Sequence, residues 1–319
     1  MRSGLRIVFV MDPVDTVIVD EDTTFALMLE AQNRGHRADF CTYRNVGLKD
    51  GRPFASVRRA TLQRDPDAPV VLADPETVDL AEVDAVFIRK DPPFDADYLW
   101  LTLILERLRG ATLVLNDPRG LRDANEKLYA CHFPALMPPT LVSADATAIK
   151  AFMEEVGGKA VIKPVDGHGG AGIFALVEGD KNVNAAIETV TAEGRRVAMV
   201  QAYLPEVALG DKRILLMAGA PLGAILRVPR GDDLRSNIHV GGTVEATALD
   251  AADQRIIEAV APRLGADGLH FVGLDVIGGR LTEVNVTSPT GIQQMSRLGG
   301  SNCEARVIEW IETRESVNP

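Results

Sequence analysis

The stretch "GLDVIGGRLTEVNVTSPTG", residues 273–291, decides how the C-terminal part of the chain folds. It predicts two β-strands joined by a turn that contains two glycines, with Asp275, Glu283 and Asn285 among apolar residues. We expect a three-residue turn over 278–280, which is a common hairpin connection. This turn would place Asp275 opposite Glu283 and Asn285 on the same face, whereas a two-residue turn would separate the two acids.

Two carboxylates that face each other across paired strands repel each other, and apolar surroundings raise the cost. A cation between them would remove this problem. Carboxylate and amide oxygens suit Mg²⁺, and the hairpin has no His or Cys that would favour zinc. Two other interpretations are a salt-bridged pair and the paired carboxylates of a glycosidase, although the latter leaves the chain's glycine loop and lysines unexplained.

Composition argues against several classes of protein. The chain has 319 residues, enough for two or three domains, and its net charge of −11 argues against non-specific nucleic-acid binding. Its apolar runs are too short to span a membrane, and the first, over 5–11, reads as a buried strand and not as a signal peptide. The three cysteines are too far apart in sequence to suggest a disulfide framework or a zinc site. We therefore expect a soluble, cytoplasmic protein.

The first third of the chain alternates strands with helices, which is typical of a parallel α/β sheet. Strands are expected over 5–11, 37–43, 85–88 and 112–117, and helices over 22–34, 95–110 and 121–133. The segment 47–80 is expected to be irregular or an edge hairpin. The alternation stops near Arg122, where we place a domain boundary.

The rest of the chain predicts an α+β region. A Pro-rich connection is expected over 133–142. Before the hairpin, strands are expected over 159–164, 172–177, 197–204, 211–219 and 220–229. Helices are expected over 146–156, 183–193, 251–264 and 302–312.

A glycine-rich stretch, "VIKPVDGHGGAGIFALV" (161–177), matches the pattern GxGxxG at Gly167, Gly169 and Gly172. A dinucleotide-binding fingerprint must lead into a helix, but the residues that follow read as a strand. No Lys-Ser or Lys-Thr follows, so a P-loop is also disfavoured. We favour a glycine hairpin that covers a phosphate with bare N–H groups over a plain turn.

Several basic residues lie near glycine-rich turns in this acidic chain. Lys163 and Lys127 are each either an exposed lysine or a phosphate ligand. Arg89 and Lys90 end a strand of the α/β sheet, where ligands of open sheets bind. Further along the chain are Lys212, Arg213, Arg227, Arg230 and Arg235, with Asp211 beside the first of them. This local excess of positive charge predicts a site for a phosphate or carboxylate.

Together these stretches resemble the bacterial glutathione synthetase family of the ATP-grasp superfamily, over essentially the whole chain. The resemblance rests on MDP (11–13), RKDPPFD (89–95), LRDANEKL (121–128), IKPVDGHGGAGIF (162–174), GDKRILL (210–216) and VGLDVIGGRLTEVNVTSPT (272–290). A strand lysine and the EVN element are shared by ATP-grasp proteins generally. RKDPPFD and the hairpin stretch are more specific to this family.

The resemblance implies an α/β N-terminal domain with a parallel, Rossmann-like sheet (1–122), followed by a two-lobed α+β ATP-grasp unit (123–203 and 204–319) that holds ATP between its lobes. It implies two Mg²⁺ ions, replaceable by Mn²⁺, held by Asp275, Glu283 and Asn285. ATP contacts are implied for Lys127, Lys163, Gly167, Gly169, Gly170, Gln201, Tyr203, Leu204 and Asp211. Substrate contacts are implied for Arg89, Lys90, Asn285, Ser288 and Thr290, and catalytic roles for Arg213, Arg235 and Asn237. A loop over about 228–243 would close over the site.

The family joins γ-glutamylcysteine to glycine with ATP through an acyl phosphate, and the resemblance implies the same reaction and a homotetramer. No protein nucleophile is needed, which fits the lack of a convincing Ser-His-Asp or Cys-His arrangement. The alternatives are another ATP-grasp ligase, such as a D-alanine–D-alanine ligase or a glutamate-adding enzyme, and a non-catalytic nucleotide-binding protein. RKDPPFD weighs against the first, and the complete set of Asp275, Glu283 and Asn285 weighs against the second.

Overall fold

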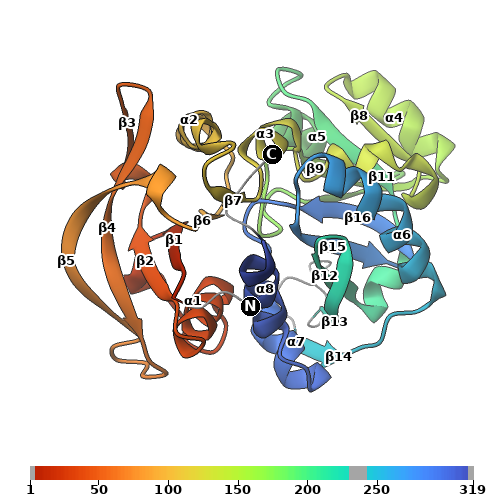
Figure 1. Cartoon of the computed structure of the whole chain (residues 1–319). Coiled ribbons are helices and arrows are strands. Elements are labelled where there is room, and N and C mark those ends of the chain that lie inside the picture. The colour runs from red at the N-terminus through yellow and green to blue at the C-terminus, as the bar shows by residue number, and fades with distance from the viewer. Residues whose placement is uncertain (1–3, 230–242, 315–319) are drawn as a thin grey trace.

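The computed structural model describes residues 4–229 and 243–314. Over these residues the chain forms three β-sheets, and Figure 1 shows the N-terminal sheet on one side of the molecule and the other two on the opposite side. No helix in the described ranges is long and apolar enough to cross a membrane. Arg235 and Asn237 lie outside these ranges, as does most of the loop expected over 228–243.

The N-terminal sheet is the predicted α/β layer. Its strand order is β3-β4-β2-β1-β6-β7, with β5 paired to β4. The pairs β1–β2, β1–β6 and β6–β7 are parallel, which confirms the predicted parallel sheet. The segment 47–80, which was expected to be irregular or an edge hairpin, forms most of the antiparallel strands β3, β4 and β5. The elements are β1 Arg6–Met11, α1 Thr23–Asn33, β2 Arg37–Cys41, β3 Val46–Lys49, β4 Arg52–Leu62, β5 Val70–Asp79, β6 Ala85–Arg89, α2 Ala96–Leu105, β7 Leu113–Leu115 and α3 Pro118–Asp123.

Two antiparallel sheets make up the predicted α+β region. The first has the order β10-β9-β11-β8 and packs against α4 and α5, and the second has the order β14-β13-β12-β15-β16 and packs against α6, α7 and α8. The elements are β8 Thr140–Ser143, α4 Ala146–Glu155, β9 Lys159–Pro164, β10 Phe174–Val177, α5 Val183–Thr191, β11 Ala198–Ala202, β12 Asp211–Met217, β13 Ala220–Val228, β14 Thr243–Ala246, α6 Ala251–Ala266, β15 Phe271–Ile277, β16 Arg280–Asn285, α7 Ile292–Gly299 and α8 Cys303–Thr313.

The helix expected over 121–133 is wrong, because α3 ends at Asp123. The side-chain oxygen of Asn125 accepts hydrogen bonds from the backbone N–H groups of Lys127 (3.1 Å) and Leu128 (3.0 Å). Such local bonds offer the backbone an alternative to the helix. Lys127 therefore lies in a turn and not on a helix surface. The connection expected over 133–142 ends in β8, and no element was predicted where β14 and α7 lie.

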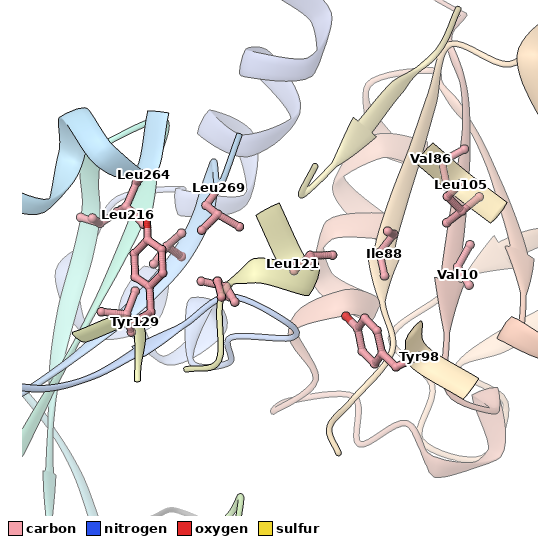
Figure 2. Packing of buried hydrophobic residues seen from close by; sticks show 14 of the residues in the cluster. Val10, Val86, Ile88, Tyr98, Leu105, Leu121, Tyr129, Leu216, Leu264 and Leu269 are labelled. Carbon is pink, nitrogen blue, oxygen red and sulfur yellow. The ribbon is translucent and has the colours of Figure 1, made fainter. Parts of the chain in front are cut away.

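Two hydrophobic clusters join the N-terminal domain to the C-terminal sheet: one includes Phe87 and Phe271, and the other lies around Leu121. Figure 2 shows buried residues of this second cluster in both parts of the molecule: Val10 and Ile88 belong to the N-terminal sheet, and Leu216 belongs to β12. Leu121 of α3 lies between them. The sheet β8–β11 has a separate core with α4 and α5, which includes Ile162, Ile187 and Val200. We infer that the N-terminal and C-terminal parts stabilise each other, whereas the central lobe packs mainly on itself.

Asn116, which follows β7, connects the N-terminal domain to the C-terminal sheet. Its side-chain oxygen accepts from the backbone N–H groups of His270 (2.9 Å) and Phe271 (2.8 Å). Its amide nitrogen donates to the carbonyls of Phe271 (2.9 Å) and Val286 (2.8 Å). The side chain is buried, so all four of these groups depend on it for a partner.

We expect Asn116→Ala to lower the free energy of unfolding by roughly 3 kcal/mol or more, because it leaves several buried backbone groups without partners. Urea denaturation measures this loss. The matched control is Asn45→Ala, which removes an exposed side chain that bonds only within its own turn and is expected to change stability by about 0.5 kcal/mol. Equal losses in the two variants would contradict the proposed role of Asn116.

Candidate functional site: a charged cavity between the lobes

The hairpin β15–β16 pairs Asp275 with Glu283, as expected, but its turn differs from the prediction. Ile277 pairs with Arg280, so the turn has two residues, and both Gly278 (φ 55°) and Gly279 (φ 71°) adopt positive φ. Paired glycines suit a two-residue turn that matches the twist of the strands. The register shifts by one residue beside Asp275, and this bulge restores the facing of the two acids. The predicted three-residue turn is therefore wrong, but the prediction that Asp275 lies opposite Glu283 is confirmed.

A cavity of about 440 Å³ lies at the hairpin face that carries these acids. Its wall includes the hairpin, the glycine loop, the turn after α3, the segment after β11, the segment after β16, and residues of β12 and β13. The predicted site residues on this wall are Lys127, Lys163, Gly167, Gly169, Gly170, Gln201, Tyr203, Leu204, Asp211, Arg213, Asp275, Glu283, Asn285, Ser288 and Thr290. The fold therefore collects residues from several distant parts of the sequence around one cavity.

Asp275 is held by two arginines. Its carboxylate accepts from Nε (2.5 Å) and Nη2 (3.0 Å) of Arg213, and Nη2 of Arg227 lies 3.0 Å from Oδ1. Burial alone would raise the pKa of Asp275, but the two guanidinium groups hold this pKa below its ordinary range. Asp275 is therefore charged at neutral pH.

Two lysines lie beside Glu283 and the glycine loop. Nζ of Lys127 is 3.0 Å from Oε1 of Glu283 and also donates to the carbonyl of Gly167. Lys163 is buried, and this burial lowers its pKa, although the nearby Glu283 raises it. Two ammonium groups on the wall of one cavity are suited to bind the charged oxygens of a phosphate.

Asp211 contributes a carboxylate that is only partly paired. Its Oδ2 accepts from Arg227, while its buried Oδ1 has no hydrogen-bond partner among the described residues. Burial raises the pKa of Asp211 to about 7. A buried oxygen without a partner on a cavity wall can accept a hydrogen bond from a polar ligand or from water.

The glycine loop joins β9 to β10 as a hairpin, and these strands are antiparallel. It does not lead into a helix, so the dinucleotide interpretation is excluded, as expected. Gly169, Gly170 and Gly172 adopt positive φ, which side chains rarely tolerate. The loop therefore brings bare backbone to the cavity beside Lys163.

The donor set of the hairpin fits Mg²⁺. Asp275, Glu283 and Asn285 bring hard oxygen atoms to one wall of the cavity, two of them anionic. The amide nitrogen of Asn285 donates to Asp275 Oδ2 (3.2 Å), so the amide oxygen is the atom left for a cation. No group of three His, Cys, Asp or Glu side chains within 4–229 and 243–314 could hold a metal, so this site needs Asn285.

Arg89 and Lys90 are not among the described residues that line the cavity, and their contact with substrate stays a prediction. Both are buried. Arg89 donates to the hydroxyl of Thr24 (3.0 Å) and to the carbonyl of Pro289 (3.0 Å). It therefore connects the segment after β16 to α1 of the N-terminal domain. Lys90 bonds the carbonyl of Asp91 and lies near the ring of Tyr98.

Two residues of this region were missed as site residues in the sequence. Arg227 was noted only as part of a basic group, yet it contacts both Asp211 and Asp275. Glu126 lies on the cavity wall, where desolvation and then the charge of Glu283 raise its pKa. Glu126 and Lys127 were both assigned to the helix expected over 121–133, so the turn in which they lie was not predicted.

The chain matches known proteins over almost its whole length. The family model described as "Prokaryotic glutathione synthetase, N-terminal domain" matches residues 5–122, and the one described as "Prokaryotic glutathione synthetase, ATP-grasp domain" matches residues 126–300. The glutathione synthetase of Vibrio parahaemolyticus is 43% identical over 97% of this chain and 98% of its own length. That of Gloeobacter violaceus is 45% identical over 96% of both chains.

Solved structures of other enzymes share the fold at low sequence identity. The D-cycloserine synthetase DcsG covers 96% of this chain and 99% of its own, with a TM-score of 0.64 and 18% identity. The ATP-grasp ligase PsnB, in a complex with a minimal precursor, Mg and ADP, covers 97% of this chain and 98% of its own, with a TM-score of 0.61 and 16% identity. The fold is thus that of an ATP-grasp ligase. With the family models and the relatives, it follows that the chain belongs to the prokaryotic glutathione synthetase family and is an ATP-dependent ligase.

The two-residue turn predicts a cost for a side chain at Gly278. We expect Gly278→Ala to lower the free energy of unfolding by about 1–2 kcal/mol, because φ is positive there and a Cβ would lie 2.9 Å from the side chain of Glu206. The control is Gly265→Ala in α6, where nothing lies within 4 Å and a gain of up to about 1 kcal/mol is expected. A Gly278→Ala protein as stable in urea as the wild type would contradict the turn.

Proposed function

We propose that this chain joins γ-glutamylcysteine to glycine with hydrolysis of ATP to ADP and phosphate. The observation that carries the proposal is the cavity in which the carboxylates of Asp275 and Glu283 adjoin Lys127, Lys163 and the glycine loop. The chain's relatives named glutathione synthetase support the choice of substrates.

ATP lies between the two lobes of the ATP-grasp unit in this proposal. The ammonium groups of Lys127 and Lys163 and the N–H groups of the glycine loop bind its phosphates. The segment that contains Gln201, Tyr203 and Leu204 borders the adenine, and Asp211 bonds a polar group of the nucleotide. The position of all these residues on one cavity wall supports the assignment.

Asp275, Glu283 and Asn285 would hold two Mg²⁺ ions, which Mn²⁺ can replace. When bound, the metal neutralises negative charge on the transferring phosphoryl group. The chain prepares this site by keeping Asp275 ionised between Arg213 and Arg227.

The cysteinyl carboxylate of γ-glutamylcysteine takes the γ-phosphoryl group of ATP, which gives an acyl phosphate and ADP. The amine of glycine attacks the acyl carbon, loses a proton and displaces phosphate. No protein nucleophile takes part, so catalysis consists of positioning and charge stabilisation. Arg213 suits charge stabilisation, because it bonds Asp275 on one side and its Nη1 lies 3.4 Å from the carbonyl oxygen of Thr290 on the other. Ser288 and Thr290, on the cavity wall, bind the dipeptide.

Three further statements belong to the proposal. The chain divides into an N-terminal domain (1–122), a central lobe (123–203) and a C-terminal lobe (204–319), and the separate core of the central lobe supports this division. The chain assembles as a homotetramer, which the family resemblance supports and light scattering tests. Arg235 and Asn237 act in catalysis, on the same resemblance.

The central test measures phosphate and tripeptide in one sample, with γ-glutamylcysteine and glycine each omitted in turn. We expect phosphate release that requires γ-glutamylcysteine and one tripeptide for each phosphate when glycine is present. Phosphate release that does not depend on γ-glutamylcysteine, or no release with all substrates present, would refute the proposed reaction.

Glu283→Gln tests the metal site. We expect Mg²⁺-dependent turnover to fall about 100-fold or more, since a charged oxygen is lost beside the transferring phosphate, while the melting temperature stays near that of the wild type. A Mg²⁺ titration followed by thermal melting reports binding without turnover. The control is Glu178→Gln, which replaces an exposed carboxylate outside the cavity. A folded Glu283→Gln protein with normal Mg²⁺ dependence would show that Glu283 is only a salt-bridge partner of Lys127.

A further inference from the structure

The segment after β16, residues 286–291, carries Ser288 and Thr290 on the cavity wall and has no regular secondary structure. Side chains from distant parts of the chain hold its second half. Arg89 bonds the carbonyl of Pro289 (3.0 Å), and the hydroxyl of Thr23 accepts from the N–H of Gly291 (3.2 Å). The orientation of this segment is therefore set from outside.

Glu126 holds the first half of the same segment. Its Oε1 accepts three hydrogen bonds, from the N–H of Val286 (2.9 Å), the N–H of Thr287 (3.0 Å) and the hydroxyl of Thr287 (2.8 Å). The backbone carbonyl of Glu126 also accepts from the N–H of Val284, at 2.9 Å. Glu126 thus spans the junction between the strand that carries Glu283 and Asn285 and the segment that carries Ser288.

The carboxylate of Glu126 has no ion-pair partner among the described lysines and arginines, and it lies near another acid, Glu283. A desolvated carboxylate without a cation is costly unless hydrogen bonds compensate for the lost water. The compensating bonds here all come from Val286 and Thr287. The position of the carboxylate and the position of the segment therefore depend on each other.

We infer that Glu126 is a positioning residue for the dipeptide substrate: by holding Val286 and Thr287 it sets Ser288 and Thr290 in the orientation that receives γ-glutamylcysteine. The inference rests on the proposed function. It assigns no chemical step to Glu126. Since ATP is bound mainly by Lys127, Lys163 and the glycine loop, loss of Glu126 affects the dipeptide and spares the nucleotide.

Glu126→Ala and Glu126→Gln together test this role. We expect Glu126→Ala to lower kcat/KM for γ-glutamylcysteine about 30- to 100-fold, because a small displacement of positioning groups has effects of this size, with KM for ATP nearly unchanged. Gln keeps an oxygen that can accept the same N–H groups, so Glu126→Gln should stay within about fivefold of the wild type, as the loss of a charge-assisted bond predicts. Calorimetric titrations with γ-glutamylcysteine and with a non-hydrolysable ATP analogue measure the two affinities without turnover.

Two controls separate positioning from general destabilisation. Glu304→Gln alters another buried carboxylate, which accepts from the hydroxyl of Ser296 and does not line the cavity. This variant should leave both affinities unchanged. Thr287→Val removes the hydroxyl that donates one of the three hydrogen bonds to Glu126. It should weaken γ-glutamylcysteine binding a few-fold, about the cost of one hydrogen bond. If Glu126→Ala does not fold, Thr287→Val carries the test.

Three results would overturn the inference alone: a Glu126→Ala protein with wild-type kinetics, equal losses for ATP and γ-glutamylcysteine, or a Glu126→Gln protein as impaired as Glu126→Ala. The third would mean that the charge, and not the hydrogen bonds, is what matters. A wild-type protein that binds ATP but does not use γ-glutamylcysteine would instead refute the proposed function, and with it the dipeptide role of Glu126.

Discussion

Asp275 and Glu283 face each other across β15 and β16, and the rest of the site depends on this like-charged pair. Two carboxylates at this spacing in an apolar sheet are unfavourable unless cations lie beside them. Arg213 and Arg227 lie beside Asp275, and Lys127 lies beside Glu283. These cations come from β12, β13 and the turn after α3, so the pair becomes tolerable only when the whole C-terminal sheet and that turn have assembled around it.

The same balance prepares the cavity for ligands of both signs. The carboxylate and amide oxygens of the hairpin suit a metal, and the ammonium groups of Lys127 and Lys163 suit the phosphates that accompany it. A metal and a phosphate that bound there together would each replace part of an internal ion pair and would leave little charge uncompensated. Preorganised charges of this kind need no rearrangement of water during reaction. Asp211 Oδ1 has no hydrogen-bond partner among the described residues, so it is free to bond a polar group in the cavity.

Much of this could be predicted from the sequence, and the errors have physical causes. The parallel N-terminal sheet, the glycine hairpin and the facing of Asp275 and Glu283 were predicted correctly. The turn length was wrong because the choice between a three-residue turn and a two-residue turn with a bulge depends on the register further along the strands. The helix across Lys127 was wrong because the side chain of Asn125 bonds the backbone there instead.

The sequence by itself determined what depends on near neighbours: the period of strands and helices, the glycines that allow positive φ, and the presence of hard oxygen ligands on one hairpin. The tertiary structure alone decided which residues hold the site in place. Glu126 bonds Val286, 160 residues away, and Arg89 bonds Pro289, 200 residues away. No local pattern marks such residues, because their partners are backbone groups whose position exists only after the sheets have packed. For the same reason the sequence did not show that the buried Arg89 also supports the segment after β16.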